Sequence, residues 1–224
     1  LVYTQAEVLS FSLLAIGIYA SAQRPLWGGV LFALAIHLKL IALVDVAGIA
    51  AAFVFHSWMT RERYLSWALR VAAGGAVASL SWHAYQFCMT PSLAEYQESW
   101  SHFSRILHAY GSGLKEEAIR PSRWTLLSTS AGGIGAMSPF GKATACVLVL
   151  APLLAVLLVF LRPRRTPAWI VMMAGGSLAH SLWWVFLSDD AWMRHGYLGL
   201  LGGAVVLAWL VSRARLVPWV VSAA

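Results

Sequence analysis

Apolar runs recur along the whole chain and are separated by short polar or basic segments. The runs cover residues 7–22, 27–38, 40–58, 65–85, 142–161, 167–187 and 196–211. A helix needs about 20 mainly apolar residues to cross the hydrocarbon core of a bilayer, and short or tilted helices can also be accommodated. The pattern therefore predicts an all-α fold, a polytopic transmembrane bundle of about seven spans that forms a single domain over residues 1–224.

The second and third runs are interrupted by charged residues. Residues 31–45, LFALAIHLKLIALVD, contain His37, Lys39 and Asp45. The two runs together are too long for one span, so we expect two short or tilted helices that meet near residues 39–45. Ionisable residues inside an apolar run are costly and commonly mark a functional site. Asp45 is expected to pair with Lys39 or His37 across the bend.

The longest polar stretch, roughly residues 86–123, belongs to a predicted extracytoplasmic loop over residues 86–140. Helical spacing of its apolar positions over residues 93–110 predicts one amphipathic helix along the membrane interface, ended by the Gly-Ser-Gly of residues 111–113. The glycine-rich GGIGAM at residues 132–137 follows no strand of a βαβ unit, so it is weak evidence for nucleotide binding.

Composition agrees with an integral membrane protein. Of the 224 residues, 60% are hydrophobic and 11% are charged, and the mean hydropathy is +0.71. The net charge of +7 comes mostly from arginines that flank apolar runs, where they orient helices and contact anionic lipid headgroups. The expected partners are therefore membrane lipids, and not nucleic acid. The two cysteines are too few for a disulfide framework or a metal knuckle.

The basic clusters all fit one orientation. The positive-inside rule places the basic clusters on the cytoplasmic side of the membrane. These clusters are Arg24, Arg61 with Arg63, residues 162–165, and Arg213 with Arg215. With this orientation, the ionisable residues that are candidates for a site all lie on the opposite face. These are Glu7, His37, Lys39, Asp45, Asp189, Asp190, Arg194 and His195. We expect an integral protein of the bacterial inner membrane, with this face outside. Carboxylates and cations at such a face suit a reaction on a lipid-linked anion.

Two stretches carry a family resemblance. TQAEVLSFSLLAIGIYA followed by RPLWGGVLFALAIHLKLIAL, and the later SDDAWMRHGYLGLLGGAVVLAWL, resemble the GT-C membrane glycosyltransferases of the protein-mannosyltransferase and aminoarabinose-transferase kind (glycosyltransferase family 39). Glu7 matches the acidic residue at the head of a helix, and Lys39 matches the lysine after an apolar run. Arg194 matches the closing arginine, followed by His195 where tyrosine is common.

The resemblance implies transfer of a sugar from a polyprenyl-phosphate donor at the extracytoplasmic face. It implies a catalytic Glu7 and substrate-binding Lys39 and Arg194, and we add the neighbouring His195 and His37 to the candidate substrate-binding set. No residue is assigned as a metal ligand, and a divalent metal stays open. The chain begins without methionine and closes on the start of a further apolar run, so we expect a fragment or a degenerate member of the family.

Other interpretations of these residues stay open. Lys39 can be a snorkelling anchor at a helix end, and Glu7 can be a carboxylate favoured by the helix macrodipole. The alternative function is a non-catalytic accessory subunit of a photosynthetic or respiratory membrane complex, with haem or chlorophyll bound through His56, His83 or His180. A transporter is a third option, weakened because no inverted repeat stands out.

Overall fold

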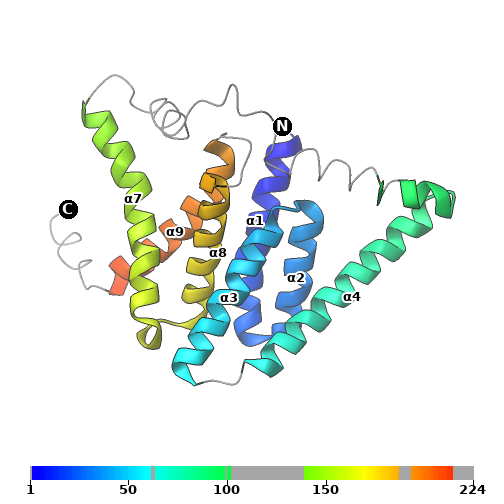
Figure 1. The fold of residues 1–224 in the computed structure, drawn as a ribbon, viewed down its shortest axis with the longest axis horizontal. Coiled ribbons are helices and arrows are strands. Elements are labelled where there is room, and N and C mark those ends of the chain that lie inside the picture. The colour runs from blue at the N-terminus through cyan, green and yellow to red at the C-terminus, as the bar shows by residue number, and fades with distance from the viewer. Residues whose placement is uncertain (1, 62–63, 99, 102–138, 187–192, 214–224) are drawn as a thin grey trace.

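The computed structural model describes residues 2–61, 64–98, 100–101, 139–186 and 193–213 (Figure 1). Within these residues the regular structure is entirely helical, and no strand occurs. The helices are α1 (Val2–Gln23), α2 (Pro25–Leu38), α3 (Ala42–Thr60), α4 (Leu65–Met89), α7 (Pro139–Leu161), the 3-10 helix η2 (Pro163–Arg165), α8 (Ala168–Phe186) and α9 (Met193–Arg213). Each of the seven predicted apolar runs coincides, over most of its length, with one of the α-helices, so the all-α prediction is confirmed for the described residues.

Local sequence signals explain several helix boundaries. Pro25 is the first residue of α2, where its missing N–H costs no hydrogen bond. Arg61 ends α3 in the left-handed conformation with φ of 61°, and its N–H bonds the carbonyls of Ser57 and Trp58. The predicted bend lies where expected, because α2 ends at Leu38 and α3 begins at Ala42.

The helices form two packed groups that share a core. In one group α2 packs between α1 and α4, and in the other α8 packs against α3, α9 and α7. α1 also contacts α3 and α8, which joins the groups (Figure 1). The fully buried core side chains include Ile49, Val156, Ile170, Met172 and Val206.

Glycines set the closest helix crossings. A Cβ on Gly48 of α3 would collide with Ala179 and with the Gly175 carbonyl of α8, and a Cβ on Gly74 of α4 would collide with the Leu26 carbonyl of α2. Helices that approach this closely need small residues at the crossing, which explains the small-residue runs within otherwise apolar helices.

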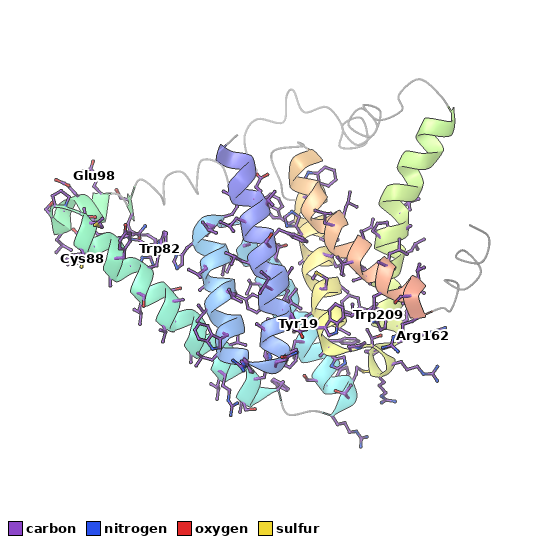
Figure 2. All side chains as sticks on the ribbon, turned by 180° about the vertical axis from the view of Figure 1, so that it is seen from behind. Tyr19, Trp82, Cys88, Glu98, Arg162 and Trp209 are labelled. Atoms are coloured by element: carbon purple, nitrogen blue, oxygen red, sulfur yellow. The ribbon has the colours of Figure 1, made fainter. Side chains whose placement is uncertain are left out.

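Successive helices run in alternating directions. Figure 1 shows α1, α3, α7 and α9 beginning at one end of the bundle, where α2, α4 and α8 end. The arginines of η2 lie in the connection from α7 to α8, at the opposite end of the bundle. Arg162, which directly precedes η2, is labelled in Figure 2 and lies at that end. The first end is called the site end below, and the second is called the basic end.

Two helical segments, Ala6–Gln23 and Ala42–Thr60, are long and apolar enough to span a membrane. The helical stretches Pro25–Leu38, Leu150–Leu161 and Gly199–Arg213 are apolar but shorter. These findings agree with membrane association, while a bundle of seven spans stays a prediction.

The predicted loop begins later than expected. α4 continues to Met89, so the loop cannot begin at residue 86. Residues 93–98 and 100–101 are helical, and the Ser92 hydroxyl accepts a hydrogen bond from the Glu95 N–H at 3.3 Å, as an N-terminal cap does. The predicted interfacial helix therefore starts where its spacing indicated. Its remainder and the GGIGAM segment lie outside the described residues.

Candidate functional site

Glu7 and Lys39 meet at the site end. Glu7 lies near the start of α1 and is 5% exposed. Lys39 is the residue that ends α2, with an extended backbone whose N–H bonds the Ala35 carbonyl. Its Nζ lies 2.9 Å from Glu7 Oε1, and the two side chains are 25% and 6% exposed respectively. The pair thus has a buried carboxylate and an ammonium that still reaches the surface.

The packing of α1 against α2 holds this pair in register. The Ser10 hydroxyl, one turn after Glu7, donates a buried hydrogen bond to the Ala35 carbonyl at 3.1 Å. Further along the same contact, a Cβ on Gly28 would collide with Ser21. A close, antiparallel crossing therefore fixes which residue of α1 faces the end of α2.

A two-residue turn connects Lys39 to α3. The N–H of Ala42, the first residue of α3, bonds the Lys39 carbonyl at 2.9 Å. No glycine or proline interrupts this sequence. Lys39 itself lies at the C-terminus of α2, where the helix dipole favours a cation.

Asp45 pairs with His180 of α8, so the expected pairing with Lys39 or His37 is wrong. Asp45 Oδ1 lies 2.8 Å from His180 Nδ1, and the side chains are 9% and 2% exposed. The reason is that Gly48 and Gly175 bring α3 against α8, which turns Asp45 toward that helix. Asp45 therefore does not lie at the exposed rim with Lys39, as the bend alone suggested.

A small cavity adjoins Asp45. It measures about 20 Å³ and is lined by Phe11, Leu14, Ala15, Ile18, Asp45, Ile49, Met173, Gly176, Ser177 and Gly202. That volume accommodates about one water molecule. The Asp45–His180 pair therefore belongs to a closed interior, and a substrate does not fit beside it.

His37 faces α4 and takes part in an aromatic cluster. Its Nε2 lies 3.1 Å from the Ser79 hydroxyl, and its ring stacks on Trp82 with centroids 5.5 Å apart. The ring also meets His83 edge-on at 5.3 Å, and His83 in turn contacts Trp100 at 5.0 Å. His37 thus lies two residues before Lys39 in the chain but on the side of α2 that contacts α4, whereas Lys39 contacts α1.

Arg194 and His195 belong to the first turn of α9, which begins at the site end (Figure 1). Their side chains lie outside the described part of the structure. The helix that carries them is therefore on the expected end of the bundle, and their contacts with Lys39 stay a prediction.

Some residues of the site were not predicted from sequence. Ser10 and Ser79 are ordinary small polar residues of apolar helices, and no sequence signal distinguishes them. His180, a candidate haem or chlorophyll ligand in the alternative function, instead bonds Asp45 of the neighbouring helix α3 through Nδ1. His56 similarly bonds the Thr166 carbonyl through Nε2 at 3.1 Å.

Among the described residues, no group of three or more His, Cys, Asp or Glu side chains lies close enough to hold a metal ion. A comparison with known proteins gives no match to a protein-family model, to a curated protein or to a solved structure. The function must therefore be argued from the geometry at Glu7 and Lys39.

Proposed function

We propose that this chain is a GT-C-like membrane glycosyltransferase, which transfers a sugar from a polyprenyl-phosphate donor at the extracytoplasmic face. The observation that carries the proposal is the ion pair between Glu7 and Lys39. These two residues match separate parts of the family pattern, stand 32 positions apart in the chain, and lie 2.9 Å apart in space. The start of α9, with Arg194, lies at the same end of the bundle.

The membrane arrangement that we propose has seven spans with the site end outside. Its support is the mean hydropathy of +0.71, the two membrane-length apolar helices, and the alternating direction of the helices. The basic residues 162–165 follow α7 at the opposite end, as the positive-inside rule requires for cytoplasmic connections. The bacterial inner membrane is the location we propose.

The chemistry assigns different tasks to the two residues. Lys39 is partly exposed and can bind the donor phosphate, which stabilises the negative charge that grows on the leaving phosphate. Glu7 can accept the proton of the acceptor hydroxyl as that oxygen attacks the anomeric carbon. The bond between the anomeric carbon and the phosphate oxygen then breaks, and polyprenyl phosphate leaves with the electron pair.

Sugar transfer in membranes tests this proposal. The full chain would be reconstituted in vesicles. Polyprenyl-phosphate mannose or polyprenyl-phosphate aminoarabinose, radiolabelled in the sugar, would be added as donor, and a membrane extract would be added as acceptor. We expect donor consumption by the wild-type protein and a loss of about 100-fold in Lys39→Ala and in Glu7→Gln. Arg24→Ala, an exposed cation at the basic end, is the control and should retain activity.

Two outcomes would contradict the proposal. One is that neither donor is consumed above the level of vesicles without the protein. The other is that Arg24→Ala loses as much activity as Lys39→Ala, because the loss would then follow from any missing cation.

A second candidate function is an accessory subunit of a larger membrane complex. The observation that favours it is the exposed apolar surface of α4, whose outer end extends away from the other helices (Figure 2). Leu69, Val77, Leu80 and Phe87 are all at least half exposed. A visible absorption spectrum with haem or chlorin bands, lost in His83→Ala or His180→Ala, would favour this function over sugar transfer.

A further inference from the structure

The basic end contains a cleft that the proposed transfer reaction does not use. It lies where η2 meets the last turns of α9, and its volume is about 400 Å³. Its lining consists of Arg164, Arg165, Thr166, Pro167, Trp209 and Arg213, and we call it the basic cleft. Figure 2 shows Trp209 toward this end of the bundle, away from the start of α1.

Three arginines line the basic cleft. Arg164, Arg165 and Arg213 are all exposed, and the lining formed by the described residues contains no carboxylate. Like charges so close together repel one another, and a bound anion relieves that repulsion. The composition of the cleft therefore favours an anionic ligand.

Two of these arginines are held in place by the protein. Arg164 donates a hydrogen bond from Nε to the Met59 carbonyl at 3.0 Å, which ties η2 to the end of α3. The guanidinium of Arg213 lies 5.8 Å from the centre of the Trp209 ring, within the range of a cation–π contact. Ordering these long side chains before binding reduces the entropy that a ligand must overcome.

The ligand chemistry follows from the lining. A guanidinium matches the oxygens of a phosphate with two parallel hydrogen bonds, so arginine is a preferred phosphate ligand. Trp209 and Pro167 add an apolar wall beside the charges. A second cleft of about 400 Å³ lies on the other side of Arg164 and Arg165 and includes Met59 and Leu161, the latter 76% exposed.

We propose that the basic cleft binds the phosphodiester headgroup of an anionic phospholipid, with Arg164, Arg165 and Arg213 on the phosphate and Trp209 against the glycerol and acyl region. The apolar wall favours a lipid over a free anion. Anionic lipids are abundant in the cytoplasmic leaflet, on which this end would lie. The inference depends on the membrane location and not on the proposed sugar transfer.

Lipid retention by the purified full chain tests the proposal. The protein in detergent would be titrated with phosphatidylglycerol, phosphatidylcholine or inorganic phosphate, and bound ligand would be counted by native mass spectrometry. We expect phosphatidylglycerol to bind and phosphatidylcholine to bind at least tenfold more weakly. The double variant Arg165→Gln, Arg213→Gln should lose about tenfold in affinity for phosphatidylglycerol, which corresponds to about 1.4 kcal/mol.

The matched control is the double variant Arg24→Gln, Arg61→Gln, which removes two charges from exposed arginines outside the basic cleft. It should bind phosphatidylglycerol as the wild-type chain does. Equal losses in the two double variants, or equal binding of the two lipids, would overturn the proposal. Inorganic phosphate that binds as tightly as phosphatidylglycerol would assign the cleft to a free anion and would overturn the lipid assignment.

Discussion

At the scale of single residues, the described part of the chain contains two acid–base side-chain pairs with different surroundings. The Glu7–Lys39 pair reaches the surface through a side chain that is 25% exposed, whereas Asp45 and His180 are both nearly covered. An ammonium that keeps contact with the surface can exchange its carboxylate partner for a phosphate. A closed pair beside a cavity of about 20 Å³ cannot do so, and its role is to join α3 to α8.

The Asp45–His180 pair should stabilise the fold. Replacing His180 with alanine leaves the buried Asp45 carboxyl group without this hydrogen-bond partner, and we expect the free energy of unfolding to fall by about 2 kcal/mol. Unfolding in mixed detergent micelles measures it. His83→Ala, which removes a partly exposed histidine, is the control and should cost less than half as much.

The double variant Asp45→Leu, His180→Leu separates pairing from simple loss of volume. We expect it to be more stable than His180→Ala alone, because replacing both partners of a buried hydrogen bond by apolar residues leaves no polar group unsatisfied. A double variant that is less stable than either single variant would contradict the role assigned to the pair.

At the scale of helices, close crossings decide which polar residues meet. Gly48 lies against Gly175 and Ala179, and this contact sets the register that brings Asp45 to His180. On the other side of the bundle, Gly29 and Gly74 bring α2 against α4. Close backbone contacts deeper in the bundle therefore determine which side chains meet at the site end.

Gly48→Ala tests this dependence. The added Cβ would collide with the Gly175 carbonyl, and we expect a loss of about 2 kcal/mol in unfolding free energy. Gly75→Ala is the matched control, because the nearest atom to its Cβ is the Gly29 carbonyl oxygen at an ordinary 3.6 Å. Equal losses in the two variants, measured in the same micelles, would contradict the crossing as the source of the register.

The positions of the helices could be predicted from the sequence better than the side chains that meet between them. The break at Lys39 and the helix start after Ser92 follow from local patterns of charge and spacing, so they could be predicted. The partner of Asp45 lies 135 residues away and depends on the α3–α8 crossing, which no local pattern encodes. The family resemblance selected Glu7 and Lys39, and the structure then supplied their contact.

At the scale of the whole molecule, the proposed orientation separates two regions of different chemistry. The site end has a carboxylate and an ammonium that we propose act on a lipid-linked donor, while the basic end has three arginines that line one cleft. In this arrangement anionic lipid would anchor one end and the reaction would take place at the other.

Cysteine labelling can test this orientation. Cys88 is exposed near the end of α4, so in a Cys146→Ala background a membrane-impermeant maleimide should label it from outside intact cells. A cysteine placed by Arg162→Cys in a chain with both native cysteines removed should react only after permeabilisation. Labelling of both positions from the same side would refute the orientation.

The central claim is that the Lys39 ammonium binds the phosphate of a polyprenyl-phosphate donor, in competition with the Glu7 carboxylate. The most direct measurement is the affinity of the purified chain for polyprenyl phosphate. Lys39→Gln should weaken binding about tenfold, and Glu7→Gln should strengthen it about tenfold while lowering transfer about 100-fold. Equal affinity in the wild-type chain, Lys39→Gln and Glu7→Gln would contradict the claim.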